Sequence, residues 1–271
     1  MHLKRWITAL VAAPVLVALI SFGGPFLFAG FVSIVCILAL WEYYRIVLPG
    51  REKAHAKAII ALGYVSGPGI IWAAAIHSVA FLLGLVLLNF MGCALLGVVK
   101  YKQCSSISET IAKQVLGTIY IPGLLSCLIM IQNGTDGAAW IYFLLCVVFA
   151  GDVGAFYVGT YLGRRKLCPA VSPGKTIEGA IGGISFNLGA GALFKYLAMP
   201  LIPWAASILF FVSVGVAGQI GDLFESQLKR AGNIKDSGAI LPGHGGILDR
   251  IDALLFVAPV AYFFKAYVMC Q

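Results

Sequence analysis

The longest polar stretch of the chain, residues 221–252, mixes five carboxylates with four cations and several glycines. Carboxylate oxygens are the ligands that Mg²⁺ prefers, and this ion usually keeps water and substrate phosphates in its shell. Cationic side chains and the amides of a glycine-rich loop would bind the remaining phosphate oxygens. The stretch therefore predicts phosphoryl-type transfer, in which positioning and charge neutralisation supply most of the catalysis. Its aspartates and cations are Asp222, Asp236, Asp249, Asp252, Lys229, Arg230, Lys235 and Arg250.

Spacing within this stretch indicates how the side chains are presented. Residues 222–230 read as a helix that continues out of an apolar segment, so Asp222 and Ser226 would share one face at i, i+4. Asp249 and Asp252 stand at i, i+3 and would share a face of the next helix. The alternative is a solvated loop with surface ion pairs, each worth about 0–1 kcal/mol. His244, which lies between glycines, would on its own more often be an ordinary loop residue.

A second polar patch covers residues 163–179. Ser172 and Pro173, followed by Thr176 and Glu178, predict the start of a helix, with Lys175 near its positive end. A helix amino terminus beside a lysine suits a phosphate group. Asp152 precedes this patch inside an apolar segment, where it is either a functional acid or a structural hydrogen-bonding one.

Composition identifies the elements that must hold these residues. Apolar residues make up 61% of the 271 residues and charged residues 11%, against about 25% charged in a soluble protein. A soluble fold could not cover so much apolar surface, and a disordered chain is excluded by the same numbers. The chain is therefore predicted to be an all-α polytopic integral membrane protein.

A spanning helix needs about 20 mostly apolar residues, and the chain offers about nine such stretches. The runs are continuous, which favours helices over the ten-residue alternation of a barrel. The predicted spans are 6–22, 26–44, 58–76, 79–99, 114–132, 138–163, 177–198, 201–223 and 251–269.

The cations predict the orientation of these spans. With a cytoplasmic amino terminus, every lysine and arginine except Lys195 and Lys265 falls on the cytoplasmic side, as the positive-inside rule expects. The net charge of +8 is then largely topological, and no nucleic-acid partner is expected. Lys4 and Arg5 before an apolar run also fit a cleaved signal, which would leave eight spans. The lack of a clear A-x-A site favours an uncleaved first span.

Other classes of protein find less support. The seven cysteines and four histidines show no metal-ligand or disulfide spacing. A transporter would spread its acids through the spans and often shows an internal repeat, whereas here seven of eleven acids lie between residues 152 and 252. The D-x2-D-G-x2-A-R pattern of CDP-alcohol phosphotransferases is absent. We therefore separate an amino-terminal scaffold, 1–137, from a catalytic region, 138–271, with polar loops 163–179 and 222–252.

Residues 226–252 closely resemble the phosphatidate cytidylyltransferases, also called CDP-diacylglycerol synthases. The family pattern S-x-x-K-R-x4-K-D-x-G-x2-L-P-G-H-G-G-x-x-D-R-x-D is met at every specified position from Ser226 to Asp252. Upstream, Asp152 and the segment Ser172–Gly179 are similar to the D-x-G-A and S-P-K-K-T-x-E-G elements, except that Gly174 replaces a lysine found in many relatives. The resemblance is strong over roughly residues 140–271.

The resemblance implies an inner-membrane enzyme, with its site facing the cytoplasm, that converts CTP and phosphatidate to CDP-diacylglycerol and pyrophosphate. A related lipid phosphate or another nucleotide stays open as an alternative substrate. The resemblance also implies Mg²⁺, allows a monovalent cation such as K⁺, and is compatible with a homodimer. The expected metal ligands are Asp222 and Asp249, with Asp152 and Asp252 as further candidates. Residues expected to act in catalysis are Lys229, Arg230, Lys235, Asp236, His244 and Arg250. Residues expected to bind substrate are Ser172, Lys175, Thr176, Glu178, Ser226, Gly243, Gly245 and Gly246.

Overall fold

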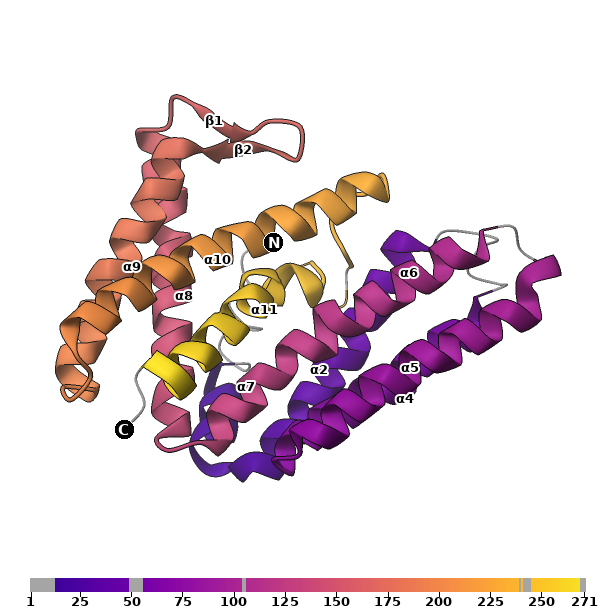
Figure 1. The fold of residues 1–271 in the computed structure, drawn as a ribbon. Coiled ribbons are helices and arrows are strands. Elements are labelled where there is room, and N and C mark those ends of the chain that lie inside the picture. The colour runs from indigo at the N-terminus through magenta and orange to yellow at the C-terminus, as the bar shows by residue number, and fades with distance from the viewer. Residues whose placement is uncertain (1–12, 49–55, 104–105, 239, 241–244, 269–271) are drawn as a thin grey trace. The chain divides into compact units, whose positions relative to one another are not determined.

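The computed structural model of the chain describes residues 13–48, 56–103, 106–238, 240 and 245–268 (Figure 1). Within these residues, eight helical segments are long and apolar enough to cross a membrane. They confirm the predicted spans from the second onward. The predicted first span, 6–22, lies partly outside the described residues, and its described part forms a shorter apolar helix at Ala13–Phe22.

The elements follow one another as apolar helices interrupted by short turns and one hairpin. Three short segments (η1, η2 and η3) depart from α-helical geometry, and η2 contains Pro122. In order, the elements are α2 (Gly24–Val47), α4 (Lys57–Ala75), α5 (Val79–Lys100), η1 (Tyr101–Gln103), α6 (Ile107–Thr118), η2 (Ile119–Gly123), α7 (Leu124–Asn133), α8 (Gly137–Tyr161), β1 (Lys166–Cys168), β2 (Ser172–Thr176), α9 (Ile177–Ala198), α10 (Trp204–Ala231), α11 (Leu248–Phe263) and η3 (Phe264–Val268).

The chain divides into two units, each of which is compact in itself. The first unit contains Met1–Asn133 and Ala231–Arg250, and the second contains Gly134–Arg230 and Ile251–Gln271. Helix α11 therefore begins in the first unit and continues in the second. The polar segment before α11 packs with the amino-terminal helices, a grouping that position along the chain does not suggest.

In the first unit, α4 packs against α2, α5, α6 and α7. A buried polar cluster joins three of these helices. Gln114 Nε2 donates to Asn89 Oδ1 at 2.9 Å, and Ser66 Oγ donates to the same oxygen at 3.1 Å. Polar groups in an apolar bundle must satisfy one another, so this cluster fixes how α4, α5 and α6 pack together.

In the second unit, α8 and α9 lie side by side (Figure 1). Glycines allow this close packing. A side chain at Gly179 would lie 2.9 Å from the Ala155 carbonyl oxygen, and one at Gly183 would lie 3.0 Å from the Gly151 carbonyl oxygen. The small-xxx-small spacing of these glycines predicts helix contact, and the structure confirms it.

A two-stranded hairpin connects α8 to α9, which the all-α prediction did not include. Strands β1 and β2 are antiparallel, with Lys166 opposite Thr176. The predicted span 177–198 is confirmed as α9, whereas Ser172 and Pro173, which were expected to form part of the helix start, lie in β2. The helix begins at Ile177, and Thr176 is its N-cap, with Oγ1 accepting from the Gly179 N–H at 3.1 Å. Pro173 favours an extended conformation at Ser172, the first residue of β2.

Candidate active site

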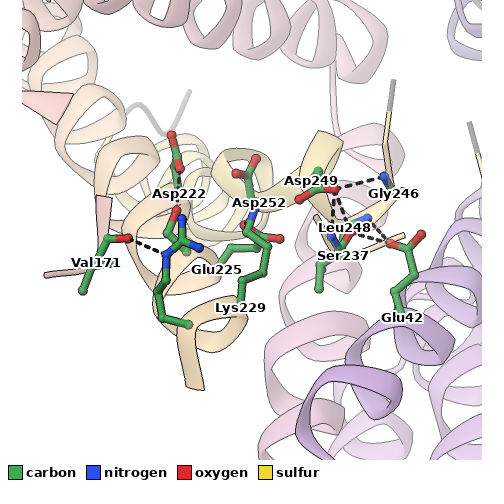
Figure 2. A network of polar contacts seen from close by, with 12 residues as sticks. Glu42, Val171, Asp222, Glu225, Lys229, Ser237, Gly246, Leu248, Asp249 and Asp252 are labelled. Carbon is green, nitrogen blue, oxygen red and sulfur yellow. Dashed lines mark hydrogen bonds and ion pairs between the residues drawn. The ribbon is translucent and has the colours of Figure 1, made fainter. Parts of the chain in front are cut away.

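The predicted site residues fall into two polar groups, one in each unit, and each group is described by itself (Figure 2). The group in the second unit comes from the hairpin and from α8, α10 and α11. The group in the first unit comes from α2, from the segment before α11 and from the first turn of that helix. His244 and Gly243, both predicted to act in the site, lie outside the described residues.

In the second unit, Asp222 is bound by a lysine from the hairpin. Lys175 Nζ lies 2.6 Å from Asp222 Oδ2, and both side chains are partly exposed. Ser226 Oγ donates to Asp222 Oδ1 at 3.4 Å, which confirms that the two residues share a face of α10. Strand β2 and helix α10 thus bring a predicted phosphate ligand to a predicted metal ligand.

Asp252 lies on α11, close enough to Asp222, Asp152 and Lys229 to interact with them electrostatically. A side chain at Gly221 would lie 2.5 Å from the Asp252 carbonyl oxygen. The absence of a side chain there lets α10 and α11 approach closely beside Asp222. Three of the four predicted metal ligands therefore belong to one electrostatic group within the second unit.

Lys229 is paired with a carboxylate that the sequence analysis did not single out. Glu225 is fully buried, and its Oε2 lies 2.5 Å from Lys229 Nζ. Their i, i+4 spacing, with the acid first, is the favourable order on a helix and could have indicated the pair. Arg230 follows on α10, and its Nε donates to the Val171 carbonyl oxygen in the hairpin turn at 3.2 Å. Two predicted phosphate ligands are thus held at one end of α10.

A small cavity of about 30 Å³ lies within the second unit, between α8, α9, α10 and α11. Asp152, Asn187 and Gln219 line it together with small residues. Asn187 is buried, and its Oδ1 has no hydrogen-bond partner among the described residues. A cavity of this size has room for about two water molecules, which would satisfy that oxygen.

The hairpin and the start of α9 are fixed by Glu178. Its carboxylate accepts hydrogen bonds from the backbone N–H groups of Arg164 and Arg165, at 2.9 and 3.1 Å. Thr176 is engaged as the N-cap of α9. These two predicted substrate-binding residues thus have structural partners in the hairpin, and their contact with substrate stays a prediction. Ser172, at the start of β2, is partly exposed.

In the first unit, Asp249 is held by the segment that precedes α11. Its Oδ2 accepts from Ser237 N–H at 3.1 Å, from Ser237 Oγ at 2.9 Å and from Gly246 N–H at 3.0 Å. Gly245 has φ +80°, a conformation that favours glycine, and directs the chain into this turn. The Gly246 amide, predicted to approach phosphate, here binds Asp249.

The residues of α2 that complete this group were not among the predicted site residues. Glu42 accepts hydrogen bonds from Ile247 and Leu248 N–H, and Arg45 Nη2 donates to the Ser237 carbonyl oxygen at 2.8 Å. The available signals were an acid and an arginine, Glu42 and Arg45, at the end of an apolar span. The same residues are also typical of the interface between membrane and water. Lys235, Asp236 and Arg250 are exposed in the structure, and their catalytic roles stay predictions.

The donor chemistry of these residues fits Mg²⁺. Among the described residues no three His, Cys, Asp or Glu side chains are arranged as a complete metal site. Mg²⁺ is commonly bound by only one or two carboxylates plus waters and substrate phosphates, so the acids present suffice. The Lys175 ammonium lies beside Asp222, so this carboxylate already faces a positive charge.

Comparison with known proteins finds similarity to one family over nearly the whole chain. Residues 3–268 match the cytidylyltransferase family. A protein of Thermotoga maritima named phosphatidate cytidylyltransferase is 33% identical over 266 residues, 95% of this chain and 94% of that protein. A protein of the same name from Staphylococcus epidermidis is 32% identical over 265 residues, 94% of this chain and 96% of its own length.

A third similar protein, the phosphatidate cytidylyltransferase of Bacillus subtilis, is 46% identical over 152 residues. That match covers 56% of each of the two chains. Because the match to the family covers nearly all of the spanning helices as well as the polar motif, this chain belongs to the cytidylyltransferase family.

Proposed function

We propose that this protein is a phosphatidate cytidylyltransferase that transfers the CMP moiety of CTP to phosphatidate. The products are CDP-diacylglycerol, a precursor in phospholipid biosynthesis, and pyrophosphate. The observation that carries the proposal is the group of acids and lysines in the second unit, above all Lys175 bound to Asp222. The relatives that match along nearly the whole chain carry this activity in their names.

The reaction suits a site made of cations and carboxylates. A phosphate oxygen of phosphatidate attacks the α-phosphorus of CTP, and the bond from that phosphorus to the bridging oxygen of pyrophosphate breaks. The attacking group is already an anion, so no strong general base is required. The main barrier is the repulsion between two polyanions, and oriented positive charges lower it. We assign this role to Lys175, Lys229 and Arg230, with Lys235 and Arg250 as further candidates.

Mg²⁺ is the proposed cofactor, with Asp222 and Asp249 as its ligands and Asp152 and Asp252 as alternatives. When bound, the ion would neutralise phosphate charge on CTP and orient the α-phosphorus. Lys175 would then leave Asp222 and bind phosphate oxygens. Glycines of the 243–246 segment would provide amides to the nucleotide, although Gly246 N–H binds Asp249 in the structure.

The assay that tests this proposal uses the purified protein in mixed micelles with labelled CTP and phosphatidate. CDP-lipid should form with Mg²⁺ and be lost with chelator. Absence of product across a panel of nucleotides and lipid phosphates would contradict the proposal. Exchange of K⁺ for Na⁺ in the same assay tests a monovalent cation, and the molar mass of the purified protein tests a homodimer.

We further propose that the site faces the cytoplasm, where CTP is available. The two cations assigned to the opposite side lie over tryptophan rings, Lys195 over Trp204 and Lys265 over Trp140, as is typical of interfacial belts. In a variant without native cysteines, an impermeant maleimide applied to spheroplasts should label Leu201→Cys and spare Lys166→Cys. The reverse labelling would contradict this orientation.

A further inference from the structure

A buried carboxylate of the amino-terminal half holds the segment that carries the family motif. Glu42 on α2 is 0% exposed. Its Oε1 accepts from Ile247 N–H at 3.0 Å, and its Oε2 accepts from Leu248 N–H at 2.8 Å (Figure 2). A buried carboxylate is costly unless hydrogen bonds compensate its lost hydration, so this position is built around Glu42.

The partners of Glu42 are the amides at the start of α11. The first N–H groups of a helix have no partner within the helix, and they form its positive end. Glu42 satisfies two amides there and supplies the negative charge that this end favours. Asp249 lies in the same first turn, so the contact that fixes the start of α11 also fixes the backbone of Asp249.

Two motif glycines make room for this carboxylate. A side chain at Gly238 would overlap Glu42 Oε1, and one at Gly246 would lie 2.5 Å from Glu42 Oε2. Both glycines belong to the D-x-G and H-G-G parts of the motif. Close approach of Glu42 is therefore a physical reason for glycine at these two positions, besides any approach of phosphate.

Ser237 connects Glu42 to Asp249. Its hydroxyl oxygen lies 2.9 Å from Glu42 Oε2 and 2.9 Å from Asp249 Oδ2, so the hydroxyl can donate to either carboxylate. Arg45 binds the Ser237 carbonyl oxygen and keeps the residue in place. The direction of the Asp249 carboxylate thus depends on α2 through a hydroxyl and through the first turn of α11.

We propose that Glu42 is a positioning residue of the cytidylyltransferase site, which orients Asp249 for the metal-bound nucleotide. This role rests on the proposed function of Asp249 as a metal ligand. Partners that orient a metal ligand typically change metal affinity or activity by about 10- to 100-fold when they are mutated. An anchor of purely structural value would change stability and leave metal affinity and turnover of the folded protein unaltered.

The test measures binding of Mn²⁺, as a probe for Mg²⁺, by electron paramagnetic resonance in the purified full-length protein, together with kcat and KM. Glu42→Gln should weaken Mn²⁺ binding and lower kcat by about 10- to 100-fold, with little change in KM for phosphatidate. Glu42→Asp, which keeps the charge, should recover part of both. Glu109→Gln, which removes an exposed acid of the same unit, should match the wild type.

Ser237→Ala provides a second, milder variant. It should weaken Mn²⁺ binding less than Glu42→Gln does, and its effect should largely vanish when Glu42→Gln is already present, because both act through one path. If Glu42→Gln does not accumulate as folded protein, Ser237→Ala and Glu42→Asp decide the question.

Folded Glu42 variants with wild-type Mn²⁺ affinity and kcat would overturn the role of Glu42 and leave the proposed function intact. A wild-type protein that neither binds Mn²⁺ nor forms CDP-lipid would instead overturn the proposed function, and the role of Glu42 with it.

Discussion

Lys175 on β2 and Asp222 on α10 form an ion pair in which Nζ lies 2.6 Å from Oδ2. The pair joins the two polar segments of the sequence within one unit, and it places a phosphate-binding cation next to a metal-binding acid. Without substrate each charge neutralises the other. A bound metal ion would be a stronger partner for Asp222, and a triphosphate a stronger partner for Lys175. We therefore expect the ion pair to break when substrate binds, and to contribute little to the stability of the fold.

Lys175→Gln should therefore impair catalysis more than stability. Loss of one oriented charge of this kind costs about 100-fold or more in rate. We expect kcat/KM for CTP to fall by that amount, while the thermal midpoint changes little because the pair is partly exposed. Lys166→Gln, an exposed lysine of β1, is the matched control. Activity within about threefold of wild type would remove Lys175 from the site.

Asp249→Asn should preserve the fold and abolish most turnover. The amide oxygen can still accept from the Ser237 and Gly246 N–H groups that hold Oδ2, so the start of α11 should stay intact. The missing charge would weaken metal binding, and kcat should fall by about 100-fold or more. Asp136→Asn, in the turn before α8, serves as control. Turnover close to wild type in the folded variant would exclude Asp249 as a metal ligand.

The spanning helices and the motif residues could be predicted because each is a local property of the sequence. Apolar runs of sufficient length predict helices, and Asp222 with Ser226 follows from helical spacing alone. Individual contacts between side chains of the second unit were harder to predict from the sequence. The pairing of Lys175 with Asp222 depends on the hairpin, whose two short strands show no alternation that would distinguish them from a loop.

Glu42 illustrates why the rest of the site could not be predicted. Its partners lie about two hundred residues further along the chain, and a glutamate at the end of an apolar span equally fits an interfacial residue. Only packing of the segment Ala231–Arg250 with the amino-terminal helices reveals the difference. The division into an amino-terminal scaffold and a catalytic region stays a prediction. Glu42 lies in the predicted scaffold, yet its hydrogen-bond partners lie in the predicted catalytic region.

Variants of the buried ion pair between Glu225 and Lys229 test stability and catalysis separately. Glu225→Gln should lower the free energy of unfolding by about 3–5 kcal/mol, because it removes the counter-charge that forms an ion pair with the largely buried Lys229. The double variant Glu225→Leu/Lys229→Leu should recover stability, since well-packed apolar residues often replace such a pair at no cost. It should stay inactive, because Lys229 is a proposed phosphate ligand.

Unfolding by detergent titration together with the CTP assay measures both quantities. The i, i+4 pair of the exposed Glu109 and the half-buried Lys113 provides the comparison, and Glu109→Gln should cost about 1 kcal/mol or less. Full activity in the double variant would show that Lys229 only neutralises Glu225.

The contact between α8 and α9 leads us to expect opposite effects of alanine at two glycines of α9, Gly179 and Gly189. A methyl group at Gly179 would lie 2.9 Å from the Ala155 carbonyl oxygen, a backbone atom that can move only with α8 itself. A methyl group at Gly189 would meet no other atom within 4 Å. Gly179→Ala should therefore destabilise the protein by about 1–3 kcal/mol through overpacking. Gly189→Ala should be neutral or stabilise it by up to about 1 kcal/mol, because alanine favours the helix.

Because α9 begins directly after the hairpin, displacement of α9 at Gly179 should also move Lys175 away from Asp222. Gly179→Ala should then raise KM for CTP, whereas Gly189→Ala should leave it unchanged. Thermal midpoints and CTP titrations of the two variants test both effects. Equal behaviour of the two variants would mean that close packing of α8 on α9 neither stabilises the unit nor positions the hairpin.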